Sequence, residues 1–118
     1  MKLSRLHILL VCNLGASTGI MVTKMREIAK NSNALKDVDV KIDAKPAGEL
    51  REYVSDYDVV LVGPQIRHQY EHLKKICDEH GKPSGIIDTA DYGMVNGGNV
   101  LKQALRLVLS HSGTDQKE

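Results

Sequence analysis

The sequence predicts a single α/β domain in which helices cover both faces of a four-stranded parallel sheet with strand order 2-1-3-4. The length of 118 residues is typical of one domain. Short apolar runs alternate with longer stretches of helical periodicity, a pattern that favours parallel strands joined by helices. Right-handed crossovers in a small sheet favour this strand order. We expect residues 1–109 to form the domain and residues 110–118 to form a flexible, polar C-terminal tail.

Four segments predict the strands. Residues 6–11 and 59–62 are continuous apolar runs, as expected for strands that are buried on both faces. Residues 38–43 alternate between apolar and charged side chains, which suits a strand at the edge of the sheet. The short run at residues 84–87 follows Pro83 and predicts the last strand.

Apolar side chains recur at helical spacing between and after these runs. The predicted helices cover residues 17–31, 46–54, 69–80 and 99–109. In the third of them, Tyr70, Leu73, Ile76 and Cys77 share one face, and Gly81 is a natural helix stop. Cys77 is therefore expected to be an inert core thiol.

Composition and charge argue against several classes of protein. The net charge is +1, and the chain has four Tyr but no Phe or Trp, which argues against a nucleic-acid partner. The apolar run at residues 6–11 is much shorter than the roughly 20 residues of a membrane span. It also lacks the length and cleavage site of a secretory signal. Two cysteines make no disulfide framework, so we expect a cytoplasmic protein.

The predicted strand order makes Cys12 a candidate functional residue. The winding of such a sheet reverses between the first and third strands, and ligands bind beyond the carboxyl ends of the strands at that point. Cys12 ends the first strand. Backbone N–H groups of the loop and helix that follow form an anion nest, which favours a nucleophilic thiolate. The predicted phosphate-binding residues are Asn13, Leu14, Gly15, Ala16, Ser17, Thr18 and Gly19.

This arrangement suits the transfer of a phosphoryl group to and from Cys12. The alternative is that Cys12 is only a small buried residue at a strand end. Low-molecular-weight tyrosine phosphatases have the same topology and a similar cradle, with a Cys-x5-Arg loop. Here Thr18 stands at the arginine position, and the guanidinium that would clamp the phosphoryl group is missing. The sequence thus favours a carrier, with a phosphatase-like hydrolase or a non-catalytic regulatory domain of the same fold as alternatives.

Residues after the third strand are candidates for secondary contacts. Gln65, in the turn that begins at Gly63, could bind a phosphate oxygen or serve the turn alone. Arg67 and His68 follow at positions that could touch a partner. The run from His68 to His72 also matches the zinc pattern H-x-x-E-H, but a catalytic zinc needs a third ligand, so we expect no metal and no cofactor.

Residues after the fourth strand lie on the same rim. Asp88 or Asp91 could cap the next turn. Asp91 could instead act as a general acid, as a phosphatase-like site would require. Tyr92 could pack against the phosphate loop.

Together these motifs resemble the IIB components of the bacterial sugar phosphotransferase system, of the lactose/cellobiose (chitobiose) type. The resemblance covers nearly the whole chain. It rests on Cys12-x-x-Gly15-x-Ser17-Thr18, on Val60-Leu61-Val62-Gly63-Pro64-Gln65-Ile66, and on Ile87-Asp88 with Tyr92-Gly93 and Val100-Leu101-Lys102. It implies that Cys12 takes a phosphoryl group from a histidine of the IIA component and gives it to a sugar carried by the membrane IIC component. Ala16 and Gly19 depart from the Met and Ser that are frequent in the family, so one hydroxyl is lost.

Overall fold

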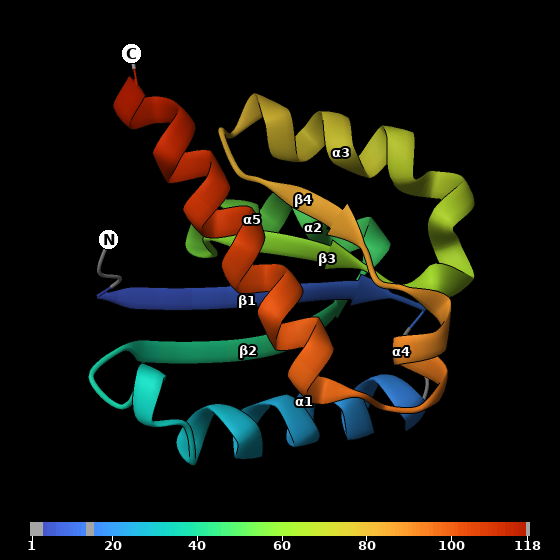
Figure 1. Cartoon of the computed structure of the whole chain (residues 1–118). Coiled ribbons are helices and arrows are strands. Elements are labelled where there is room, and N and C mark those ends of the chain that lie inside the picture. The colour runs from blue at the N-terminus through green and yellow to red at the C-terminus, as the bar shows by residue number, and fades with distance from the viewer. Residues whose placement is uncertain (1–3, 14–15, 118) are drawn as a thin grey trace.

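The computed structural model describes residues 4–13 and 16–117, and the side chains of these residues except 16–17 and 112–117. Its sheet is parallel, with the order β2-β1-β3-β4 that the sequence predicts (Figure 1). The strands are β1 (Arg5–Cys12), β2 (Asp39–Pro46), β3 (Val59–Val62) and β4 (Ser84–Ile86). The alternating segment is an edge strand, as expected, because β2 pairs with β1 alone among the described strands.

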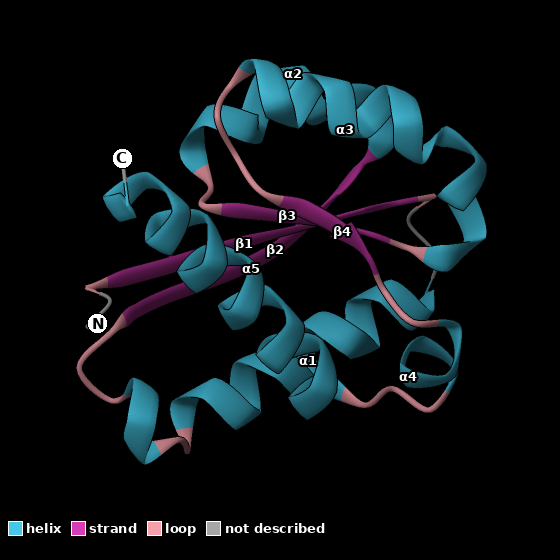
Figure 2. Cartoon of the chain, turned by 45° about the horizontal axis from the view of Figure 1, so that its top comes forward, coloured by secondary structure: helices cyan, strands magenta, loops and turns pink. Residues whose placement is uncertain are grey.

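Helices lie on both faces of the sheet, as Figure 2 shows. The α-helices are α1 (Ala16–Lys30), α2 (Leu50–Tyr53), α3 (Tyr70–Glu79), α4 (Thr89–Gly93) and α5 (Gly97–Lys117). Short 3-10 turns are η1 (Asn33–Leu35), η2 (Ala47–Glu49), η3 (Val54–Asp56) and η4 (Pro64–Gln69).

The sheet separates two apolar clusters. Side chains alternate along β1, so that Ile8 and Leu10 face α1 and α5 while Leu9 and Val11 face α2 and α3. The strand residues of both clusters are almost fully buried, and each buried Leu or Ile contributes about 1.5–3 kcal/mol. Because both faces of β1 are covered, its carboxyl end is held at a fixed place on the rim of the sheet.

Three expectations about the helices need correction. The segment expected as one helix over residues 46–54 divides into η2, α2 and η3, and β2 extends to Pro46. The five-residue helix α4 was not expected. The last helix begins at Gly97 and continues through the segment expected as a tail, to Lys117. The backbone of residues 110–117 is therefore helical, and the flexibility of the tail stays a prediction. Among the described residues, no helix is both long enough and apolar enough to cross a membrane.

Candidate functional site

Cys12 is the last residue of β1 and lies where the winding of the sheet reverses. Its neighbours in the sheet are Pro46, its register partner on β2, and Gly63, which follows β3. The Gly63 N–H donates to the carbonyl of Val11 at 2.9 Å and so extends the pairing of β1 with β3. Cys12 is 2% exposed and not part of a disulfide. Cys12 thus lies at the carboxyl end of β1, where this topology predicts that a ligand binds.

Gly63 leaves space beside Cys12. A Cβ atom built on Gly63 would lie 3.3 Å from the Cβ of Cys12 and 2.6 Å from Oε1 of Gln65. The φ of Gly63 is −64°, which any residue can adopt, so the glycine is required for space and not for its backbone conformation. The sequence indicated only a turn at Gly63, and this close approach to Cys12 was not expected.

The loop predicted to hold phosphate is described in part. Asn13 is exposed at its start, and Leu14 and Gly15 lie outside the described residues. The backbone of Ala16 and Ser17 forms the first residues of α1, but their side chains lie outside the description. The N-terminus of α1, at Ala16, thus follows Cys12 closely in the sequence, as predicted. The first N–H groups of a helix have no partners within the helix and attract anions.

Thr18 and Gly19 complete the predicted loop and differ in burial. Gly19 is exposed, while Thr18 is 2% exposed. The Oγ1 atom of Thr18 lies 2.7 Å from Oη of Tyr92, a distance at which either hydroxyl can donate. Tyr92 therefore contacts the first turn of α1 directly, as expected from the sequence. The shared hydrogen bond between the two hydroxyls was not foreseen.

Gln65, Arg67 and His68 all lie in η4, the 3-10 turn after β3. The side-chain oxygen of Gln65 approaches Gly63, next to Cys12. Gln65, Arg67 and His68 are all exposed, and the structure brings only Gln65 next to a neighbour of Cys12. A role of Gln65 in phosphate binding and of Arg67 and His68 in partner contact stays a prediction.

The two aspartates after β4 have different contacts. Asp88 is the N-cap of α4, and its Oδ2 accepts from the N–H groups of Ala90 and Asp91 at 3.0 and 3.2 Å. The Oδ1 atom of Asp91 accepts from Nδ2 of Asn99 at 2.9 Å, which links α4 to α5. The capping prediction is thus confirmed for Asp88. A general-acid role of Asp91 stays a prediction.

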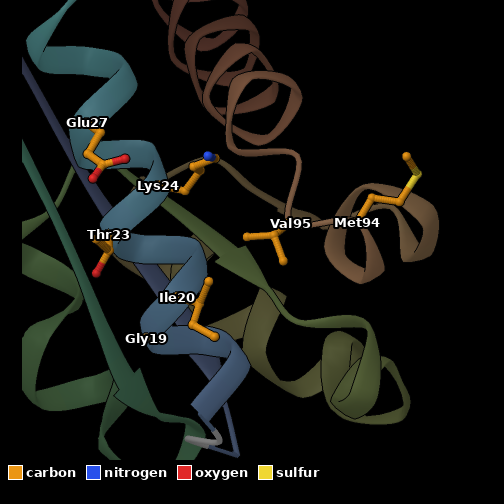
Figure 3. A pocket seen from close by; sticks show the side chains of 7 residues that line it. All are labelled: Gly19, Ile20, Thr23, Lys24, Glu27, Met94 and Val95. Atoms are coloured by element: carbon orange, nitrogen blue, oxygen red, sulfur yellow. The ribbon is translucent and has the colours of Figure 1, made fainter.

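An open groove of about 720 Å³ lies beside the start of α1 (Figure 3). Its walls are α1 and the turn that follows α4, and its lining residues are Gly19, Ile20, Thr23, Lys24, Glu27, Met94 and Val95. Ile20 and Met94 are 56% and 78% exposed, which is unusual for large apolar side chains. The groove therefore offers apolar surface next to the helix that follows Cys12.

The metal pattern is split between two elements. His68 belongs to η4 and His72 to α3, and both are exposed. Across the described parts of the chain, no group of three or more His, Cys, Asp or Glu side chains is arranged to hold a metal ion. The third ligand that a catalytic zinc needs is therefore not found among these residues.

Known proteins share both the sequence and the fold. Residues 7–103 match the family described as "PTS system, Lactose/Cellobiose specific IIB subunit". The chain belongs to this family. It is 34% identical over 103 residues to the PTS system oligo-beta-mannoside-specific EIIB component of Bacillus subtilis (strain 168), covering 87% of this chain and 96% of that one. The resemblance predicted from the motifs is thereby confirmed.

A solved structure supports the same assignment. The solution structure of the cellobiose-specific phosphotransferase IIB component protein from Borrelia burgdorferi superimposes with a TM-score of 0.74. The two chains are 36% identical, and the match covers 91% of this IIB chain and 94% of the other. A lactose-specific EIICB component of Lacticaseibacillus casei is 24% identical over 80 residues, which are 68% of this IIB chain but 13% of that protein.

Proposed function

We propose that this IIB chain is a phosphoryl carrier that uses Cys12 as its acceptor. The observation that carries the proposal is the position of Cys12 at the carboxyl end of β1, beside Gly63 and before the N-terminus of α1. A parallel sheet of this order binds ligands at this place. The unpaired N–H groups of a helix N-terminus stabilise the equatorial oxygens of a phosphoryl group.

The proposed reaction has two displacements at phosphorus. First, the Cys12 thiolate attacks the phosphorus of a phosphohistidine, an S–P bond forms, and the P–N bond breaks. The imidazole of the donor keeps the electron pair. Second, a sugar hydroxyl oxygen attacks the same phosphorus, its proton passes to a base, and Cys12 leaves as a thiolate. The loop amides and the hydroxyls of Ser17 and Thr18 hold the phosphoryl group in both steps.

The proposed partners are a phosphohistidine protein of the IIA type and a membrane IIC component that binds the sugar. The EIICB relative supports the IIC partner, because in that longer protein a segment similar to this chain makes up 13% of the length. The apolar side chains of Ile20 and Met94 near the proposed acceptor loop suit transient docking of a protein.

Intact-mass measurement tests the proposal. The chain is incubated with phosphoenolpyruvate, the general phosphotransferase proteins and an active IIA protein. We expect one added phosphoryl group on the wild type and on Cys77→Ser, and none on Cys12→Ser. An unmodified wild type in the presence of active IIA contradicts a carrier function. Rapid hydrolysis of an aryl phosphate by the chain alone would instead favour the phosphatase-like alternative.

A further inference from the structure

A buried pair of hydroxyl groups joins α4 to the helix that follows Cys12. Oγ1 of Thr18 and Oη of Tyr92 are 2.7 Å apart, although the two residues are 74 positions apart in the sequence. Thr18 is 2% and Tyr92 8% exposed. Burying a hydroxyl without a partner is costly, and this contact satisfies two groups that water does not reach.

Tyr92 stands on a firmly anchored element. Its own N–H donates to the carbonyl of Asp88 at 2.9 Å, and the side chain of Asp88 caps the same helix. Asp91, the preceding residue, accepts hydrogen bonds from Asn99 through its side chain and from the N–H of Asn96 through its carbonyl. These contacts fix α4 against the start of α5, so the Tyr92 hydroxyl has a defined position.

The turn after α4 contains a strained residue, whose backbone conformation must be held by neighbouring contacts. Val95 has a φ of 51°, a conformation that costs a β-branched residue free energy. Its N–H donates to the carbonyl of Tyr92 at 3.1 Å. Its side chain packs against the apolar cluster that lies between the sheet and the helices α1 and α5. A strained residue persists only where neighbouring contacts hold it, and here they hold the end of α4.

The chemistry of hydroxyl groups makes the Thr18–Tyr92 pair more than a packing contact. A hydroxyl has one proton to donate and two lone pairs to accept with. When Tyr92 donates to Thr18, the proton of Thr18 is available for another acceptor. Thr18 is the third residue of α1, so this acceptor would be an anion bound at the helix N-terminus.

We propose that Tyr92 is a positioning residue, which donates to Thr18 and thereby directs the Thr18 hydroxyl proton to the phosphoryl group on Cys12. The inference rests on the proposed carrier function and adds a residue to its machinery. Tyr92 acts through Thr18, so a loss of the Tyr92 hydroxyl has no effect once the Thr18 hydroxyl is removed.

Tyr92→Phe is the direct test because it keeps the buried ring and removes only the hydroxyl. Tyr70→Phe is the matched control, since the Tyr70 hydroxyl also makes a hydrogen bond, to Ser84 at 3.3 Å, on the other face of the sheet. Phosphoryl transfer from phosphorylated IIA is followed by rapid-quench mass measurement, and the phosphocysteine is observed by ³¹P NMR.

We expect Tyr92→Phe to lower the maximal transfer rate about 3- to 10-fold, the scale of one hydrogen bond, with the KM for IIA unchanged. Its ³¹P resonance should shift from that of the wild type. Tyr70→Phe should match the wild type in both. The double variant Thr18→Val with Tyr92→Phe should transfer no more slowly than Thr18→Val alone, and Thr18→Ser should keep most of the rate.

The outcomes separate the two proposals. A wild type without phosphocysteine overturns the carrier function and this inference with it. A phosphorylated wild type with an unchanged rate and ³¹P shift in Tyr92→Phe overturns the positioning role alone. The positioning role is also overturned if the double variant transfers phosphate more slowly than Thr18→Val alone, so that the two losses of rate multiply. Circular dichroism checks the folding of each variant, and if Tyr92→Phe does not fold, an unchanged rate and ³¹P shift in Thr18→Val overturn the positioning role.

Discussion

Cys12 and Cys77 are both buried thiols, and their surroundings assign them to different roles. Cys77 lies within α3, on its inner face with Leu73 and Ile76, and is fully buried. Burial raises its pKa to about 11. Cys12 ends a strand, next to the space that Gly63 leaves and before a helix N-terminus. Burial alone therefore does not distinguish a structural cysteine from a candidate nucleophile, whereas position relative to strand and helix ends does.

The largest expected difference between the two thiols is in alkylation. At pH 7.5 a thiol with a pKa of about 11 is a thiolate in roughly one molecule in 3,000, and only the thiolate reacts. We expect iodoacetamide to modify Cys12 and to spare Cys77 until the chain is unfolded in urea. Peptide mapping by mass spectrometry measures both sites in one sample. If Cys77 in the folded chain is labelled as fast as Cys12, the two thiols do not differ in reactivity.

Gly63→Ala tests whether the space beside Cys12 matters. The new Cβ would meet the Cβ of Cys12 at 3.3 Å, so that Cys12 or β3 must shift by a few tenths of an ångström. A misplacement of this kind should slow phosphoryl transfer about tenfold, since about 1 Å can cost 10²-fold. The rapid-quench assay with phosphorylated IIA measures the effect.

Gly48→Ala is the control for this variant. A Cβ on Gly48, in η2, would meet nothing within 4 Å and so would not press on Cys12. Its transfer rate should equal that of the wild type. If both alanine variants transfer phosphate as fast as the wild type, the space beside Gly63 has no part in the reaction.

The smallest expected effect concerns Cys77 and pH. Its pKa is raised in the folded chain above the ordinary value of 9.0. Below pH 9 the Cys77 thiol keeps its proton in both the folded and the unfolded chain, and the contribution of the buried thiol to the free energy of unfolding is fully present. Between about pH 9 and pH 11 the unfolded chain loses the proton first, so the free energy of unfolding falls as the pH rises.

Urea unfolding of the wild type and of Cys77→Ala across this range isolates the effect, because other titrating groups are shared. The wild type should lose stability more steeply than the variant above pH 9. At pH 7 the variant should be less stable by about 1 kcal/mol, the scale of one buried apolar atom. Parallel pH profiles of the two chains would mean that burial does not shift the Cys77 thiol.

The contrast between the cysteines also marks what the sequence could and could not predict. Strand order and the position of Cys12 followed from the alternation of apolar runs with helical periodicity. Helix α4 was missed because a single turn has no periodicity, and its signal was the cap at Asp88. The run after Leu109 is polar, so it suggested a tail although its backbone continues α5.

Contacts within the site were less predictable than its position. The sequence predicted that Tyr92 packs against the phosphate loop, but no spacing rule over 74 residues predicts its hydrogen bond to Thr18. The space at Gly63 depends on how close β1 and β3 approach each other, which is a property of the folded sheet. The resemblance to a family suggested which residues matter, but not which of them contact each other.

The edge strand β2 has a consequence for self-association. An unpaired edge of a sheet can add a strand from another copy of the chain and so begin aggregation. The side chains of Lys41 and Lys45 stand over the rings of Tyr57 and Tyr53, and the strand ends at Pro46, which has no N–H to donate. Charge and proline along this edge oppose pairing between copies. Self-pairing at this edge is thereby disfavoured, which suits the proposed carrier and its exchange of one partner for another.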